Sequence, residues 1–115
     1  MRGTIRSFLL FEAATFFVAS LIHIGVSIAG YEHQKARIAE GVIALVLLTD
    51  AVSTWIRPAA IGTAGLAGQG SALLGTLISV FTIAVGVGPR TAPDIAYHIA
   101  IVVVLISGLV ITKYT

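Results

Sequence analysis

One stretch of this chain decides the fold: residues Phe8–Ala29 read FLLFEAATFFVASLIHIGVSIA. The run is close to the ~20 apolar residues that an α-helix needs to cross a hydrocarbon core of ~30 Å. Three further apolar stretches follow it, at Ile38–Ile56, Ser71–Gly88 and Asp94–Thr112. None of the four has an interior proline, as expected for helices that satisfy their backbone within a bilayer. The sequence therefore predicts four membrane-spanning helices.

The composition of the whole chain agrees with this. Of the 115 residues, 57% are hydrophobic and 10% are charged, and the mean hydropathy is +1.03. A soluble domain averages about 25% charged residues, and a small one must cover most of its surface with polar groups. Disorder is excluded because it requires low hydrophobicity and high net charge. We expect one integral membrane domain over residues 1–115, in contact with the lipid bilayer.

The connections between the stretches predict the topology. Gly30–Arg37 and Pro89–Pro93 are short, so the helices that they join should be antiparallel neighbours in an all-α, four-helix bundle. The middle connection, Arg57–Gly70, is rich in glycine and alanine and almost uncharged. It is predicted to be a flexible loop, with a segment lying at or dipping into the membrane as the alternative.

An even number of spans places both termini on one side. Four basic residues fall on that side and three on the other, so the positive-inside rule slightly favours cytoplasmic termini. The two groups are Arg2, Arg6, Arg57 and Lys113, and Lys35, Arg37 and Arg90. The first stretch also fits a secretory signal, with Arg2 and Arg6 ahead of it and Ser27-Ile28-Ala29 as a small-x-small site. Its length and its two ionisable residues favour a true span.

Several function classes are excluded. The chain has no cysteine, which excludes disulfides, thiol chemistry and thiolate metal sites. Its seven Lys and Arg are scattered, so no basic run exists to bind nucleic acid. The glycines at 62, 65, 68 and 70 lack the strand–helix context and the lysine of a phosphate-binding loop. An enzyme of a known soluble class is not supported.

Ionisable residues within spans are costly, by roughly 2.5–3.5 kcal/mol each on insertion scales, and by default indicate a site. His23, Glu40 and His98 come from three different spans at similar depths on the side away from the termini. Imidazole and carboxylate ligands bind zinc, iron and similar divalent metals, and they also form proton relays. His33, in the loop above, is a possible fourth member. The alternative is that Glu40 and His98, near helix starts, simply reach water.

Asp94 follows Thr91 by three residues, which is typical of a helix-capping acid. It is also four residues before His98, so it is a candidate to orient that imidazole from behind.

Glu12 and Asp50 form a second polar group, on neighbouring spans near the terminal side. If they meet, two close carboxylates would share a proton or bind a cation. Glu12 and His23 are eleven residues apart, which is about 20° from a whole number of helical turns. Both residues therefore line one face of the first helix, and the two groups are predicted to open onto one polar seam.

The third stretch carries small residues at Ser71, Gly75 and Ser79, continued by Thr82 and Gly86. Small residues at this spacing let membrane helices approach closely. The stripe is either a face for self-association or part of the packing within one bundle, and the second interpretation is favoured.

The leading hypothesis is a non-enzymatic membrane module that binds a metal ion, a proton or a small ligand through His23, Glu40 and His98. A divalent metal is the cofactor considered first, and haem is the less favoured one. The alternatives are a structural or accessory subunit of a membrane complex or homo-oligomer, and a membrane redox protein with His23 and His98 as haem or metal ligands.

Three segments carry a resemblance: Phe11-Glu12-Ala13-Ala14, Gly30-Tyr31-Glu32-His33 and Gly86-Val87-Gly88-Pro89-Arg90-Thr91. With them the chain resembles small bacterial four-helix membrane proteins of no assigned function. It is similar to the DoxX-like group in size and helix count. The resemblance implies a bacterial inner-membrane setting and no particular activity or site.

Overall fold

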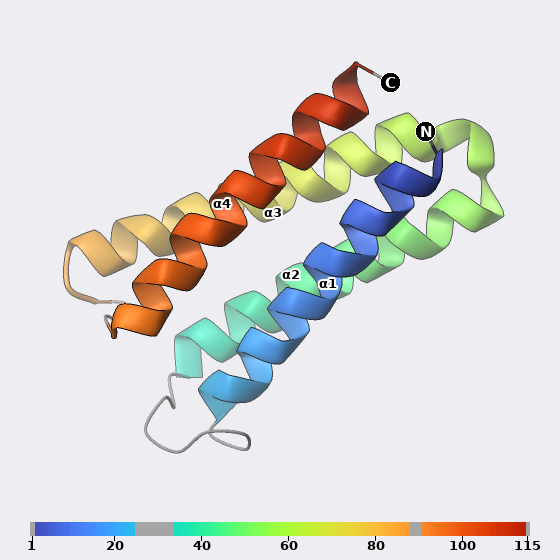
Figure 1. The fold of residues 1–115 in the computed structure, drawn as a ribbon. Helices are drawn as coiled ribbons and strands as arrows, with labels where there is room; N and C mark the ends of the chain where they lie inside the picture. Colours follow the sequence, from blue (N-terminus) through green and yellow to red (C-terminus); the bar gives the residue numbers. More distant parts are fainter. Residues whose placement is uncertain (1, 25–33, 88–90, 115) are drawn as a thin grey trace.

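The computed structural model describes residues 2–24, 34–87 and 91–114, which form four long helices (Figure 1). They are α1 (Arg2–Ile24), α2 (Gln34–Ile56), α3 (Ile61–Ala84) and α4 (Ala92–Lys113), and a short 3₁₀ helix, η1 (Pro58–Ala60), precedes α3. Successive helices run antiparallel, and α1 begins at the end of the bundle where α4 finishes (Figure 1). The predicted all-α, four-helix antiparallel bundle is confirmed.

All four helices are long and apolar enough to cross a membrane. At a rise of 1.5 Å per residue, helices of 22 to 24 residues measure about 33–36 Å, slightly more than a hydrocarbon core. The most apolar of the four candidate spans is Ala92–Lys113, with a mean hydropathy of 2.5. The chain is therefore an integral membrane protein by the length and composition of its helices.

The prediction of a flexible loop at Arg57–Gly70 is wrong. Pro58 opens η1 and α3 begins at Ile61, so most of this segment is helical. Gly65 allows the helices to pack closely, because a Cβ atom there would lie 2.9 Å from side-chain atoms of both Ile5 and Thr112. Glycine allows backbones to approach in this way within membranes. The composition that was interpreted as a loop therefore marks the point where α3 meets α1 and α4.

Buried side chains repeat along each helix mainly at alternating spacings of three and four residues. This 3.5-residue period is typical of antiparallel bundles with coiled-coil-like packing. We call these buried positions the seam. They are Ile5, Leu9, Glu12, Phe16, Ala19 and His23 on α1; Glu40, Ala44, Leu47, Ala51 and Thr54 on α2; Gly65, Gln69, Ala72, Thr76 and Ile83 on α3; and Asp94, His98, Ile101, Leu105, Gly108 and Thr112 on α4.

The outer surface of the bundle carries large apolar side chains. Phe17, Leu45 and Phe81 are each more than half exposed. Polar and small residues occupy many seam positions instead, including a buried glutamine and several buried threonines. This distribution suits a protein surrounded by lipid, where apolar side chains lose nothing by facing outward.

The predicted small-residue stripe on α3 divides between two environments. Gly75 faces α2, because a Cβ atom there would lie 3.0 Å from Cδ1 of Ile43. Ser71 is exposed. The lack of a side chain at Gly75 thus allows packing within one bundle, which is the favoured interpretation. Self-association of the chain stays a prediction.

Gln69 joins α3 to α4 within the apolar interior. Its Nε2 atom donates to the Gly65 carbonyl oxygen at 3.1 Å and to Oγ1 of Thr112 at 2.9 Å. Gly108 of α4 lies against the same amide: a Cβ atom there would overlap Oε1 of Gln69 and lie 2.9 Å from Cδ1 of Phe8. The crossing of α1, α3 and α4 therefore depends on Gly108 having no side chain.

We predict that Gly108→Ala lowers the thermal stability of the protein in detergent, because overfilling a packed interior costs about 1–3 kcal/mol. Gly70→Ala is the matched control, since a Cβ atom at Gly70 would meet nothing within 4 Å. Melting followed by circular dichroism measures both variants. Equal melting temperatures for the two would contradict the close crossing at Gly108.

Candidate functional site

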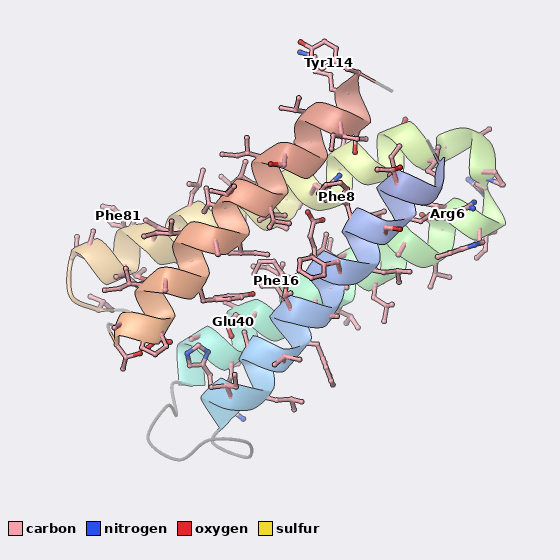
Figure 2. All side chains as sticks on the ribbon, in the orientation of Figure 1. Arg6, Phe8, Phe16, Glu40, Phe81 and Tyr114 are labelled. Carbon is pink, nitrogen blue, oxygen red and sulfur yellow. The ribbon has the colours of Figure 1, made fainter. Side chains whose placement is uncertain are left out.

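An imidazole lies between two carboxylates at the end of the bundle away from the termini. His23 Nδ1 is 2.8 Å from Oε2 of Glu40, and His23 Nε2 is 3.0 Å from Oδ1 of Asp94. The three side chains come from α1, α2 and α4. Figure 2 labels Glu40 near the start of α2, beside the last turns of α1. We call these three residues the His23 cluster.

Each member of the cluster is a seam residue, and this brings the three together. His23 lies in the last turn of α1, and Glu40 and Asp94 lie in the N-terminal parts of antiparallel neighbours. The end of one helix thus meets the beginnings of two others. All three residues are buried, with exposed fractions of 4% for His23, 4% for Glu40 and 7% for Asp94.

Asp94 is held in place by the start of α4. It is the third helical residue, and with Thr91 it forms a capping box: the Thr91 side chain accepts from the Asp94 amide, and Oδ2 of Asp94 accepts from the Thr91 amide at 3.2 Å. The Thr91 hydroxyl also contacts Oδ2. These bonds leave Oδ1 to face His23. The positive end of the helix dipole further stabilises a carboxylate at this position.

The two hydrogen bonds of the His23 cluster fix how many protons it holds. An ionised carboxylate only accepts, and a neutral imidazole has one N–H donor and one acceptor nitrogen. Making both bonds therefore takes two protons. With two protons, the His23 cluster is either an imidazolium between two carboxylates, or a neutral imidazole between one carboxylate and one carboxylic acid. Moving one proton along one hydrogen bond interconverts these states without changing the net charge, so the geometry is that of a proton relay.

The structure brings together two of the three residues predicted to form the site. His23 and Glu40 are in direct contact. The predicted third member, His98, is buried at 5% exposure, but its Nδ1 lies 2.7 Å from the backbone oxygen of Asp94 on its own helix. Asp94, expected to be a cap or to orient His98, caps its helix and also contacts His23. His33 lies outside the described residues.

The donor atoms of the His23 cluster point at one another instead of toward a shared empty position. Both ring nitrogens of His23 already face a carboxylate. Among the residues that the structure describes, no three His, Asp or Glu side chains are grouped so that they could hold a metal ion. A metal site at His23, Glu40 and His98 stays a prediction from the sequence.

The second predicted polar group does not form a hydrogen-bonded pair. Glu12 is completely buried, and neither of its carboxylate oxygens has a hydrogen-bond partner. Asp50 is partly exposed and faces α3, where a Cβ atom on Gly68 would overlap its carboxylate. Glu12 does share the α1 seam with His23, as the helical spacing indicated.

A groove runs along α1 and α4 next to the His23 cluster, with a volume of about 510 Å³. Its walls are mostly apolar, and its polar side chains are Thr15, His23, Asp94 and Tyr97. The Tyr97 ring packs edge-on against Phe16, with ring centroids 6.2 Å apart. The cluster therefore lies at one end of a largely apolar groove that continues toward the middle of α1.

At the opposite end of the bundle an arginine joins α1 to α2, a contact that the sequence did not predict. Arg6 donates to Oγ1 of Thr54 at 3.0 Å and to the Thr54 carbonyl oxygen at 2.7 Å, and its guanidinium lies 4.8 Å from the Trp55 ring centroid. The sequence signal that could have found this contact is a basic residue directly after the seam residue Ile5.

Comparison with known protein families, with curated proteins and with solved structures gives no match to this chain.

We predict that His23→Leu destabilises the protein far more than His98→Leu does. Removing His23 leaves two carboxylates buried without their partner, and breaking a buried ion pair in this way costs about 3–5 kcal/mol. Removing His98 breaks one bond to its own helix and leaves no unpaired charge. Melting temperatures of both variants in the same detergent measure the difference. If His23→Leu melts no earlier than His98→Leu, the cluster does not hold the three helices together.

Proposed function

We propose that this protein is a small, non-enzymatic integral membrane module that binds and releases a proton at His23, Glu40 and Asp94. The observation that carries the proposal is the placement of one imidazole between two carboxylates from two other helices. Of the ligands considered, a metal ion, a proton or a small molecule, the proton is favoured because each ring nitrogen already faces a carboxylate oxygen.

Proton binding at this position would be coupled to contacts between helices. With two protons in the cluster, His23 links α1 to both α2 and α4. If one proton leaves, the imidazole becomes neutral between two carboxylates, and a nitrogen lone pair then faces a carboxylate oxygen. One link becomes repulsive. If a third proton arrives, a carboxylic acid still accepts through its carbonyl oxygen. The links thus hold at low pH, and one of them fails as the pH rises.

The two links are not equivalent. Asp94 receives bonds from Thr91, whereas Oε1 of Glu40 is buried without a hydrogen-bond partner. A carboxylate with donors around it is stabilised in its charged form, and an unsatisfied one is not. When one proton leaves, the remaining imidazole N–H therefore stays with Glu40, which has no other donor, and the contact between α1 and α4 at this end is the one that weakens.

Nitrogen-15 NMR of histidine-labelled protein in bilayers tests the proposal. The chain has three histidines, so His23→Gln identifies the His23 signals. We expect these signals to report a protonation change between about pH 5 and pH 8, where histidine equilibria fall. Glu40→Gln should move the transition, and His98→Gln should leave it in place.

A distance measurement gives the structural half of this test. The absence of cysteine allows spin labels at Phe17→Cys on α1 and Ile99→Cys on α4, both of which are exposed. The distance between them should lengthen through the same pH interval. His23 signals and a distance that stay constant from about pH 5 to pH 8 would contradict proton binding and leave the cluster a structural link, the accessory-subunit alternative.

The proposal includes a bacterial inner membrane and cytoplasmic termini as the setting. It is supported by the distribution of basic residues and by the common end of the bundle at which α1 begins and α4 finishes (Figure 1).

Single cysteines test the orientation. Tyr114 and Val87 are both exposed, at 78% and 59%, at opposite ends of the bundle. With cytoplasmic termini, a membrane-impermeant maleimide added to intact cells should label Val87→Cys and should label Tyr114→Cys only after permeabilisation. The reverse pattern would place the termini outside.

A further inference from the structure

Glu12 is a buried acid that the His23 cluster does not use. It lies near the middle of α1, with an exposed fraction of 0%, and neither carboxylate oxygen has a hydrogen-bond partner. Native proteins rarely leave buried polar atoms without partners, and each such atom requires an explanation. An ionised carboxylate in this environment would have neither water, nor a donor, nor a counter-charge.

Among the described residues, no charged side chain of the helices around Glu12 forms a hydrogen bond with its carboxylate. α3 contains no titratable residue at all. The titratable residues on the other two helices within the described part of the chain include Arg37, Glu40 and Asp50 on α2, and Asp94, Tyr97, His98 and Lys113 on α4. No hydrogen bond joins any of them to Glu12.

A proton is the ligand that fits this environment. Calcium and magnesium take six or more oxygen ligands, and Glu12 belongs to no group of three acidic or histidine side chains among the described residues. A proton needs only the carboxylate itself, and it removes the charge that the apolar interior disfavours.

The polar side chain between Glu12 and the groove is Thr15, one helical turn further along α1. The Thr15 hydroxyl donates to the backbone carbonyl oxygen of Glu12 at 2.8 Å, and Thr15 lines the groove together with Tyr97, His23 and Asp94. The Tyr97 hydroxyl lies near Thr15 and is buried without a partner in hydrogen-bonding geometry. The groove, at about 510 Å³, has room for water beside these hydroxyls.

We propose that Glu12 is a second proton-binding site in the middle of the bundle, which exchanges its proton along the groove past Thr15 and Tyr97. The far end of that route is the His23 cluster, so the route, although not the site, rests on the function proposed above.

Infrared spectroscopy with carbon-13 glutamate tests the site in bilayers at neutral pH. The chain has three glutamates, Glu12, Glu32 and Glu40. We expect an isotope-sensitive band of a protonated carboxyl group in the wild type. The band should be lost in Glu12→Gln and retained in Glu40→Gln. Circular dichroism of both variants confirms that the isosteric changes leave the fold intact.

Two outcomes would overturn the site. One is a wild-type spectrum with no protonated glutamate band. The other is a band that survives in Glu12→Gln and disappears in Glu40→Gln, which would place the proton on the His23 cluster and thus favour the function proposed above while refuting this one.

Exchange of the same band in heavy water tests the route. Removing a positioned hydroxyl group that passes protons slows proton transfer. Tyr97→Phe should therefore lower the rate at which the Glu12 band shifts in heavy water by at least about tenfold. Tyr114→Phe is the matched control, because Tyr114 is exposed at the end of α4, and it should exchange like the wild type. Equal rates in all three proteins would refute exchange past Tyr97.

Discussion

The cost of burying charge in an apolar bundle governs the end of this protein where α1 meets α2 and α4. Glu40 and Asp94 are buried there, and each is hydrogen-bonded to the same imidazole, that of His23. Two carboxylates in such surroundings repel each other unless a proton and a donor lie between them. His23 supplies both, so the packing of three helices and the proton content of the cluster depend on one side chain.

The rest of the bundle follows the rules of a lipid-surrounded protein. Many large apolar side chains face outward, and small or polar ones share the seam with buried residues such as Leu9 and Leu105. Because lipid provides no hydrophobic drive between helices, close backbone approach and internal hydrogen bonds must hold them together. Gly65, Gly108 and the Gln69 amide do this between α3 and its neighbours. The same seam carries Glu12 and His23 on α1, so packing and proton chemistry share one surface.

The sequence predicted the fold better than the site. Four spans and their antiparallel order follow from hydropathy and from two short connections. The error at residues 57–70 arose because glycine disfavours helix in water, while in a membrane it permits close crossings such as that at Gly65. His23 and Glu40 were found from their depth. Asp94 was not predicted to contact His23, because its role as a helix cap already explained its presence. Only tertiary packing shows that its second carboxylate oxygen is available to His23. Hydropathy also cannot tell the seam from the outer face when both are apolar.

The central claim is that one imidazole connects two carboxylates, and a double-mutant cycle with Glu40→Gln and Asp94→Asn tests it most directly. The free energy of unfolding is measured for the wild type, both single variants and the double variant in the same detergent. Because both residues act through His23, we predict a coupling energy of about 0.5–3 kcal/mol between them. Effects that add to within about 0.3–0.5 kcal/mol, as for independent sites, would contradict the account.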